Sequence, residues 1–379
     1  YSKFGLNTTE LMEALEIAKN KNILDCVKLI HFHLGSQITN IRRIKDSLKE
    51  VGRFYSELMK FGCNIQYIDV GGGLGVDYDG SRSTFASSTN YSVQEYAKDV
   101  VYHLLETCKA ENLPHPNIIS ESGRAMTAHH SILVVNVLDV TSFPEWSEQI
   151  EIPEDAPEVV KEIFYVLGSI SNKNLIESWH DAVHLKDEVQ NKFLQGLISL
   201  ADRAIAERIY WGICRKIEAL SSRLKFMPDE ILQLKTKLAD KYFCNFSVFQ
   251  SVPDSWAIDQ VFPVVPLHRL NEEPTRNATL EDITCDSDGR IDTFIGTHRG
   301  TENTLRVHPL QPGENYPLCI FLTGAYQEIL GDLHNLFGDT NTVHVSLNED
   351  GSLNYEQIIE GENVTDVLDY VKFSADELA

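Results

Sequence analysis

The chain has 379 residues, 42% of them apolar and 23% charged, with a formal net charge of −23 at pH 7. One hydrophobic core rarely serves more than roughly 250–300 residues, so two or three domains are expected. The acidic balance argues against nucleic acid as a partner, because phosphate binding draws on clustered Lys and Arg. It is compatible with a small cationic substrate. The longest apolar stretch, 131–140, is shorter than the roughly 20 residues of a membrane span, so no membrane partner is expected.

The first residues indicate a chain that starts inside a domain. Tyr1 to Leu6 is predicted to be a strand in progress, and the pattern from Asn7 to Glu10 predicts the cap of a following helix. The seven cysteines are scattered, odd in number and without a CxxC pair. Such usage is typical of a reducing compartment, which predicts a cytoplasmic protein without disulfides or a zinc site.

Up to about residue 128, short apolar runs alternate with amphipathic helical stretches. This βαβ rhythm predicts a parallel sheet, which either a doubly wound fold or a (β/α)8 barrel would contain. In both, functional residues lie just past the carboxyl ends of the strands. Strands are predicted at 27–33, 66–70 and 117–121, and helices at 41–61 and 93–111.

The middle and the end of the chain have different patterns. No proline occurs between Pro157 and Pro228, and apolar residues recur there at helical spacing, which predicts a helical bundle. Short β-rich runs follow, and with the stretch 131–138 they predict an antiparallel β domain into which the bundle is inserted. The predicted runs are 246–249, 256–265, 291–295, 316–322 and 342–347. The predicted domains are 1–129, then 130–156 with 246–379 as the β domain, and 157–245 as the bundle.

A triple glycine, Gly71 to Gly73, directly follows one predicted strand. Glycines let the backbone approach an anion and turn N–H groups toward a phosphate, although such a cluster is also common in tight turns. The surrounding residues match neither GxGxxG nor the P-loop, which disfavours nucleotide binding. A phosphate on another small molecule remains compatible with this loop.

Two further strand ends carry polar side chains. Glu121 and Arg124 are either a surface ion pair or, beside a glycine-lined anion site, a partner for a cationic ring nitrogen and a partner for a phosphate. His33 lies nearer than His31 to the carboxyl end of its strand, so His33 is the candidate and His31 is interpreted as structural.

The acidic segment from Cys285 to Gly289 lies between β runs. Its Asp-x-Asp-Gly pattern is typical of a solvated turn, and the glutamate that an EF-hand needs at its twelfth position is absent. We therefore do not expect a calcium loop here.

Together these segments resemble the fold-type III, alanine racemase-like decarboxylases that use pyridoxal 5′-phosphate (PLP). HFHLGSQ, DVGGGLGVDYDG, ESGRAM, SWAIDQVFPVVPLHRL, CDSDG and LTGAYQE occur in the family's order. The fourth and fifth motifs and the inserted helices resemble the arginine decarboxylase branch. The resemblance implies a (β/α)8 barrel, of which residues 1–129 would be the C-terminal part, joined to a β-sandwich or barrel domain.

The resemblance also implies roles for individual residues. His33 would stack on the PLP ring, Glu121 would pair with its nitrogen, and Cys285 would protonate the α-carbon across a dimer interface. The phosphate would be bound by Ser36, Gly72, Gly73, Gly123, Arg124 and Tyr326. The substrate L-arginine would be met by Asp286 or Asp288, with Asp69 and Gly71 as further candidates. Relatives commonly carry Mg²⁺, for which the sequence indicates no ligands.

One departure from the family pattern concerns the lysine that holds the cofactor. In the family it lies on an early barrel strand, upstream of all these motifs, and Lys3 is not its replacement. We expect the chain to be part of a longer protein and to lack decarboxylase activity by itself. The alternatives are a decarboxylase of ornithine, lysine, diaminopimelate or carboxynorspermidine, or an inactive regulator with the same fold. Retention of Glu121, Arg124, Cys285 and Tyr326 favours an enzyme.

Overall fold

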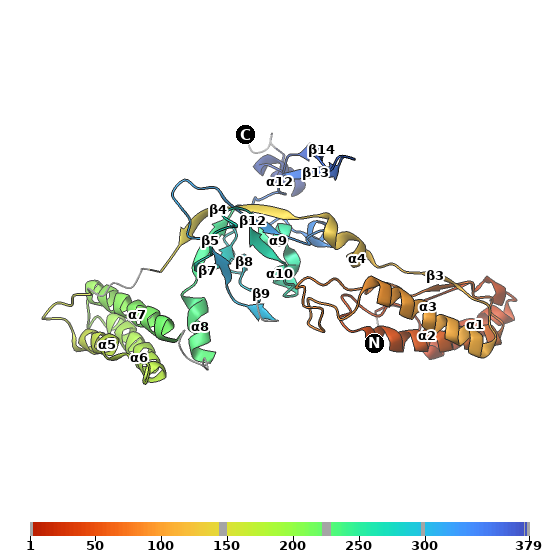
Figure 1. Ribbon diagram of the computed structural model, residues 1–379, viewed down its shortest axis with the longest axis horizontal. Helices are drawn as coiled ribbons and strands as arrows, with labels where there is room; N and C mark the ends of the chain where they lie inside the picture. The colour runs from red at the N-terminus through yellow and green to blue at the C-terminus, as the bar shows by residue number, and fades with distance from the viewer. Residues whose placement is uncertain (1–2, 144–149, 222–228, 297–299, 375, 377–379) are drawn as a thin grey trace.

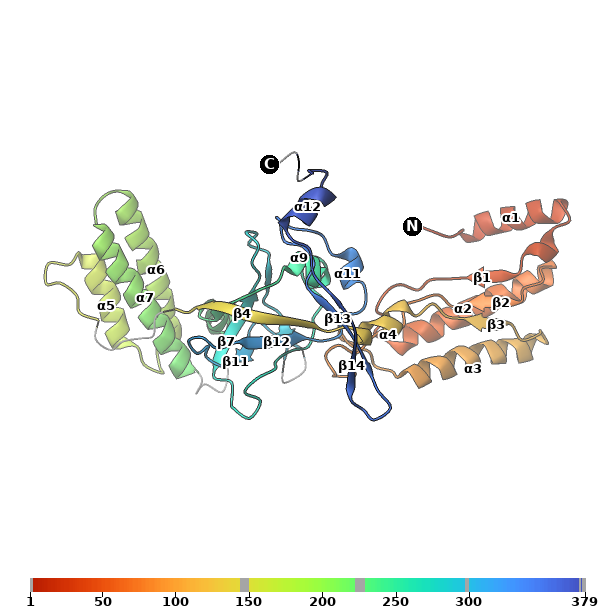
Figure 2. The same ribbon diagram turned by 90° about the horizontal axis from the view of Figure 1, so that it is seen from above.

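A computed structural model describes residues 3–143, 150–221, 229–296, 300–374 and 376. It has three main parts, which we call the barrel portion (3–128), the helical bundle (150–221 and 229–237) and the β domain (129–143, 238–296 and 300–330). A C-terminal hairpin (342–359) is attached to the β domain. The β domain lies between the other two, and the long strand β4 (Leu133–Thr141) runs from the barrel portion toward the bundle (Figures 1 and 2). Within the described residues, no helix is both long enough and apolar enough to cross a membrane.

The barrel portion contains a three-stranded parallel sheet in the order β1-β2-β3, as the alternating pattern predicts. Helices α2 and α3 begin and end at the predicted residues, and a capping box at Ser92 starts α3. The strands are shorter than predicted. The elements are α1 (Thr8–Asn20), the 3-10 turn η1 (Leu24–Cys26), β1 (Leu29–His31), α2 (Ile41–Phe61), β2 (Tyr67–Asp69), α3 (Val93–Glu111) and β3 (Asn117–Ile119).

The two faces of this sheet differ. Its outer face packs on α2 and α3, where Leu48, Tyr55 and Ile68 are almost fully buried. The opposite face is open, because Leu29 is 43% exposed and Tyr67 and Ile119 are each 39% exposed. Parallel strands in sequential order with helices on one face are the arrangement of a (β/α)8 barrel, in which the open face would be the interior.

The predicted first strand is absent from the described residues. Lys3 to Gly5 form bends, and Lys3 places its Nζ 5.0 Å from the ring centroid of Phe4. Tyr1 and Ser2 lie outside the described residues. The helix cap that follows is confirmed, since the side chains of Asn7 and Glu10 exchange hydrogen bonds with each other's backbone. The apolar pattern before Asn7 predicted a strand that has no neighbouring strand to pair with here.

The β domain is built on a seven-stranded sheet whose main path is β11-β7-β5-β4-β12-β6. Its pairs are antiparallel except for β5 with β7, which is parallel. The short helices α4 (Gly123–Thr127) and η2 (Ala128–His130) lead into it from the barrel portion. The other strands of this sheet are β5 (Asp240–Cys244), β6 (Val264–Pro266), β7 (Arg276–Glu281), β8 (Arg290–Ile291), β11 (Leu305–Val307) and β12 (Tyr316–Ile320). Strands β9 (Phe294–Ile295) and β10 (Thr301–Glu302) form a separate antiparallel pair.

Several predicted limits in this region are wrong. Strand β5 belongs to the sheet, so the sheet resumes before the predicted boundary at residue 246. The predicted β run 246–249 contains the start of helix α9 (Val248–Ser251), and 256–265 contains the end of α10 (Pro253–Ala257) and the start of β6. Ser247 caps α9 and Pro253 starts α10, and these local signals outweigh the apolar content of both runs.

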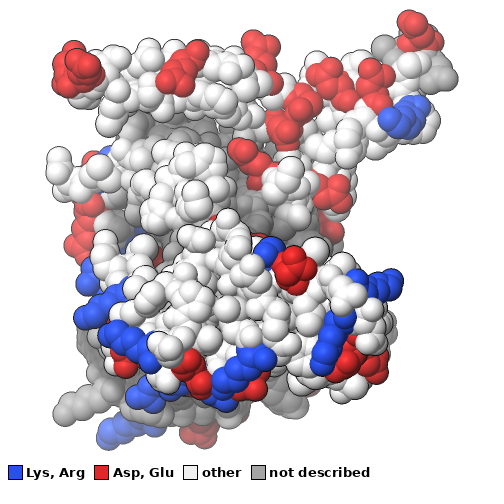
Figure 3. All heavy atoms as spheres, turned by 90° about the vertical axis from the view of Figure 1, so that its right-hand side faces the viewer, with Lys and Arg blue, Asp and Glu red and all other residues white. Residues whose placement is uncertain are grey.

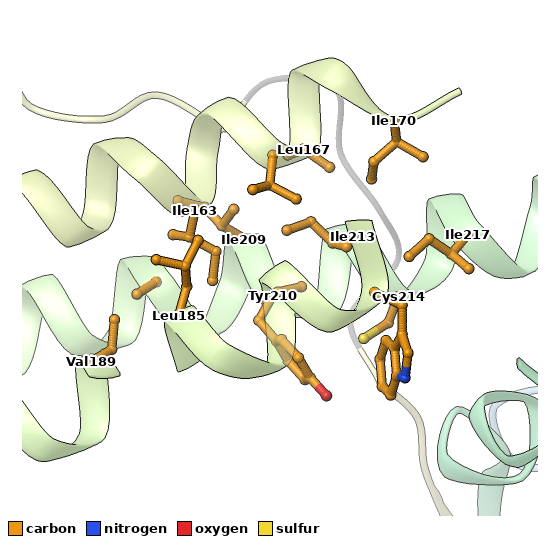
Figure 4. Close-up of a cluster of buried hydrophobic side chains, with 14 of the residues drawn as sticks. Ile163, Leu167, Ile170, Leu185, Val189, Ile209, Tyr210, Ile213, Cys214 and Ile217 are labelled. Carbon is orange, nitrogen blue, oxygen red and sulfur yellow. The ribbon is translucent and has the colours of Figure 1, made fainter. Parts of the chain in front are cut away.

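The helical bundle forms a hydrophobic core of its own (Figure 4). Ile209, Ile213 and Ile217 lie on one face of α7 and are 0% exposed, and each stabilises the bundle by roughly 1.5–3 kcal/mol through burial. They pack against side chains such as Ile163 and Leu185. The helices are α5 (Glu158–Ser169), α6 (Leu175–Leu194), α7 (Leu200–Ser221) and α8 (Asp229–Lys237).

The C-terminal hairpin consists of β13 (Thr342–Leu347) and β14 (Leu353–Ile359), preceded by α11 (Gln327–Leu330) and followed by α12 (Val364–Tyr370). It stands apart from the main sheet (Figure 1). On the face that Figure 3 shows, acidic side chains dominate the upper part, whereas both signs of charge occur on the lower part.

Candidate functional site

The three strands of the barrel portion bring their carboxyl ends to one edge. In register, His31 lies opposite Asp69, and Asp69 lies opposite Ile119. The loops beyond the strands stay in contact, since the Glu121 N–H donates to the Gly71 carbonyl at 3.0 Å. His33, the triple glycine and Glu121, which the sequence places after three separate strands, therefore meet at one place.

His33 and Glu121 form one end of the site, which we call the ring end. The Gly72 N–H donates to Nδ1 of His33 at 3.3 Å, and Glu121 Oε2 lies 3.7 Å from the same nitrogen. Because Nδ1 accepts that hydrogen bond, the neutral imidazole carries its proton on Nε2, and the Glu121 carboxylate remains available for another donor. A Cβ atom at Gly72 would lie 3.0 Å from the imidazole, so a side chain there would crowd His33. Both side chains are 51% exposed.

Asp69, at the end of β2, holds the glycine loop through a backbone hydrogen bond. Its Oδ1 accepts the Gly71 N–H at 2.9 Å, and its Oδ2 lies 3.0 Å from His31 Nδ1. Both carboxylate oxygens are thus engaged. Gly71 has a φ of 68°, and a Cβ atom there would collide with the Phe32 carbonyl oxygen. Asp69 and Gly71, two candidates for substrate contact, therefore fix the conformation of the glycine loop in this structure.

Arg124 is the centre of the other end, which we call the phosphate end. Its guanidinium is mostly buried, and it donates to the Tyr78 hydroxyl at 3.0 Å and to Ser36 Oγ at 3.3 Å. The ring of Tyr326, from the β domain, lies 4.8 Å from the guanidinium carbon. Arg124 Nε is buried and has no hydrogen-bond partner among the described residues. Three residues far apart in the sequence thus hold the Arg124 cation, which retains an unused donor.

Tyr78 is a functional candidate that the sequence reading missed. It is almost fully buried, and its ring packs edge-on against Phe262 of the β domain. Burial raises the pKa of Tyr78, while the hydrogen bond from Arg124 works in the opposite direction. The hydroxyl is therefore a neutral acceptor that orients Arg124. Its place in DVGGGLGVDYDG, seven residues after Gly71, was the available signal.

The residues of the two ends fit a phosphorylated aromatic ring such as PLP. Arg124 offers the unused Nε donor, and Gly72 leaves space where a side chain would crowd His33. A Cβ atom at Gly123 would lie 3.8 Å from the Tyr326 hydroxyl, so Gly123, Tyr326 and Arg124 lie close together. Gly73, with a φ of 99°, requires glycine because a Cβ atom there would lie 2.6 Å from the Gly35 carbonyl oxygen.

The segment 285–289, which we call the Cys285 turn, lies in the β domain after β7. Cys285 is exposed, and the Asp286 Oδ1 accepts the Asp288 N–H at 3.0 Å. The contacts of Cys285 lead to Asn335 rather than to the ring end: its N–H donates to Asn335 Oδ1 at 3.3 Å, and Asn335 Nδ2 donates to its Sγ at 3.4 Å. His334 Nε2 lies 3.8 Å from Asp286 Oδ2. His334 and Asn335 were missed in the sequence, where GDLHN was not interpreted.

His31, His33 and Glu121 are the one group of three possible metal ligands within the described part of the chain. Their ligand atoms lie within 4.8 Å of one another. Mg²⁺ prefers oxygen ligands, and two of these three are imidazoles. This group therefore does not fit magnesium.

Family models match two parts of the chain. Residues 1–128 match the pyridoxal-dependent decarboxylase, pyridoxal binding domain, and residues 153–234 match the arginine decarboxylase helical bundle domain. The second match includes α5, α6 and α7 and the first six residues of α8.

Whole-chain relatives agree with both matches. The chain is 54% identical over 378 residues to a biosynthetic arginine decarboxylase of Bacteroides thetaiotaomicron and 51% identical over 378 residues to one of Phocaeicola vulgatus. Each match covers 100% of this chain and 60% of the relative, so the chain spans about 60% of the length of these curated relatives.

Solved structures give the same picture. The crystal structure of the biosynthetic arginine decarboxylase from Campylobacter jejuni matches with a TM-score of 0.82 and 38% identity, over 100% of this chain and 61% of that one. A diaminopimelate decarboxylase from M. jannaschii, at 15% identity and a TM-score of 0.58, covering 100% of this chain and 59% of that one, shares the fold. Residues 1–128 thus match the pyridoxal-binding domain of the pyridoxal-dependent decarboxylases, and the chain as a whole is similar to the biosynthetic arginine decarboxylases.

Proposed function

We propose that the whole protein to which this chain contributes removes CO2 from L-arginine with PLP as cofactor, and so supplies agmatine for polyamine synthesis. The observation that carries the proposal is the phosphate end, where the buried Arg124 retains an unused donor beside Ser36 and Tyr326. The names of the relatives support arginine as the substrate.

The chain would bind and orient the cofactor. Arg124 would pair with its phosphate, with Ser36, Gly72, Gly73, Gly123 and Tyr326 around it. His33 would stack on the ring, and Glu121 would accept a hydrogen bond from the protonated ring nitrogen. When bound, PLP supplies an electron sink for the pair released as the carboxylate leaves, and a carboxylate at the ring nitrogen keeps that nitrogen protonated. Glu121, with a carboxylate that no hydrogen bond from His33 occupies, is suited to this role.

The Cys285 turn would act on the substrate. Cys285 would deliver a proton to the α-carbon after CO2 has left, and Asp286 or Asp288 would pair with the guanidinium, whose planar donors suit a carboxylate. Cys285 is exposed, and its contacts lead to Asn335 rather than to the ring end, so its thiol is open to the site of a second copy. The active unit would then be a homodimer or a larger homo-oligomer.

Two further properties complete the proposal. All seven cysteines are unpaired, which supports a cytoplasmic location. The family resemblance also implies Mg²⁺, but the group His31, His33 and Glu121 is unsuited to it, so no step of the reaction is assigned to a metal.

The test compares the whole protein with residues 1–379 alone. The whole protein should release CO2 from labelled arginine and much less from ornithine, lysine or diaminopimelate. Residues 1–379 alone should release none. A preference for another amino acid would contradict the arginine assignment, and robust CO2 release by residues 1–379 would contradict the expectation that a lysine elsewhere holds the cofactor.

A further inference from the structure

The segment from Gly331 to Asn335 follows α11 and is fixed against α9. The Asp332 N–H donates to the Phe249 carbonyl at 3.1 Å, and the His334 ring lies 4.5 Å from the Phe249 ring. A Cβ atom at Gly331 would collide with the Gln250 carbonyl oxygen, so the two backbones touch. The segment is therefore held in one place before it reaches the Cys285 turn.

Asn335 then forms two hydrogen bonds with Cys285. Its Oδ1 accepts the Cys285 N–H, and its Nδ2 donates to the sulfur. Rotation of the amide would break both hydrogen bonds together. Asn335 has a φ of 57°, a left-handed conformation that Asn tolerates better than most residues. The chain thus accepts a strained backbone at the residue whose side chain holds the thiol.

The turn itself has an independent support on its other side. The buried Asp282 accepts hydrogen bonds from the Val248 N–H at 2.9 Å and from the Thr284 N–H at 2.8 Å. The backbone before Cys285 is therefore fixed without Asn335. Asn335 adds a hydrogen bond to the sulfur itself, which orients the thiol.

We propose that Asn335 is a positioning residue that orients the Cys285 thiol and stabilises the thiolate that remains after proton delivery. This inference rests on the proposed function for its role in the reaction. An N–H donor stabilises a charged acceptor more than a neutral one, so the Nδ2 hydrogen bond favours the state that Cys285 reaches once its proton has left. A residue that supported the turn only through its backbone would not have this effect.

Alkylation of residues 1–379 tests the effect on sulfur without any cofactor. Cys26 and Cys285 are the exposed cysteines, and the other five are buried, so Cys26 is an internal reference. Iodoacetamide reacts with thiolates, and peptide mass spectrometry gives the rate at each site. Asn335→Asp retains the acceptor for the Cys285 N–H but replaces the donor with a negative charge. Asn335→Gly removes the side chain and suits the left-handed backbone.

Both variants should slow alkylation of Cys285 by about threefold or more, with Asp slower than Gly, and leave Cys26 unchanged. Asn348→Asp, on the C-terminal hairpin and without a contact to the sulfur, is the matched control and should leave the rate at Cys285 unchanged. Alkylation of the five buried cysteines would report a variant that does not fold. An unchanged or faster rate at Cys285 in either folded Asn335 variant would overturn the proposal.

Kinetics of the whole protein test the role in the reaction. Asn335→Asp should lower kcat for arginine about tenfold or more, with KM and the PLP absorbance unchanged. A raised KM with unchanged kcat would overturn the proposal, because Asn335 would then serve substrate binding. If the parent protein releases no CO2 from arginine, the proposed function fails, while the alkylation rates still decide whether Asn335 controls the sulfur.

Discussion

The two ends of the cofactor site differ in how completely the chain builds them. At the phosphate end, Arg124 is only 8% exposed and is held by Tyr78, Ser36 and Tyr326. At the ring end, His33 and Glu121 are each 51% exposed and lie beside the open face of β1 to β3. A preorganised cation binds an anion without further rearrangement, whereas electrostatic control of a ring requires that water be excluded. Phosphate affinity and ring chemistry should therefore be separable.

Among substitutions that separate phosphate affinity from ring chemistry, the largest effect on activity is expected at the ring end. Glu121→Gln should lower kcat of the whole protein by about 10²–10⁴-fold, because the amide cannot hold a proton on the ring nitrogen. Binding of PLP to the same variant should change less than about threefold, since no contact of Arg124 is touched. The measurements are steady-state kinetics and equilibrium dialysis. A parallel loss of affinity and kcat would show that the two ends act as one unit.

The next effect is at the phosphate end. Arg124→Met in residues 1–379 should weaken binding of PLP about 10–100-fold, because hydrogen bonds to a charged group contribute about 1.5–3 kcal/mol. Lys45→Met, at a surface ion pair with Asp99, is the matched control for loss of one positive charge. Equal weakening in the two variants would mean that only net charge matters and would contradict the specific role of Arg124.

Substitutions in the Cys285 turn should leave both ends unchanged. One of the two variants Asp286→Asn and Asp288→Asn is expected to raise KM for arginine about tenfold, because it replaces the carboxylate paired with the guanidinium by an amide. The affinity for PLP should stay constant. If neither variant changes KM, the guanidinium is bound elsewhere.

The ring end and the phosphate end also differ in how far the sequence predicts them. The ring end follows from strand periodicity: His33 and Glu121 end two predicted strands, Gly72 lies just past a third, and parallel strands bring such residues together. The limits of α2 and α3 also follow from their caps. Tyr78 and Asn335 could not be found in this way, because each acts through a contact between loops distant in the sequence. Likewise, the β runs at 246–249 and 256–265 failed because capping residues, which act locally, decided those segments.

A smaller effect at the phosphate end should come from Tyr78. Tyr78→Phe retains the ring that packs on Phe262 but removes the acceptor for Arg124. The loss of one hydrogen bond of about 1 kcal/mol should weaken PLP binding about fivefold. Tyr55→Phe is the matched control, because its hydroxyl is also hydrogen-bonded but donates to the Pro114 carbonyl, away from Arg124. An effect on affinity from Tyr55→Phe equal to that from Tyr78→Phe would remove the specific role of Tyr78.

The smallest expected effect is the pH dependence that Tyr78 adds. Burial raises the pKa of Tyr78 above its ordinary value of 10.0, so the folded chain binds the hydroxyl proton more tightly than the unfolded chain does. The resulting stability is fully present below pH 10.0 and is lost as pH rises through the higher, folded-state pKa. Tyr78→Phe cannot ionise, so its stability should decline less than that of the parent chain in strongly alkaline solution. Urea unfolding at several pH values above neutrality measures this difference. A parallel decline in the two proteins would mean that Tyr78 titrates normally and is solvated, which would break the contrast between a closed phosphate end and an open ring end.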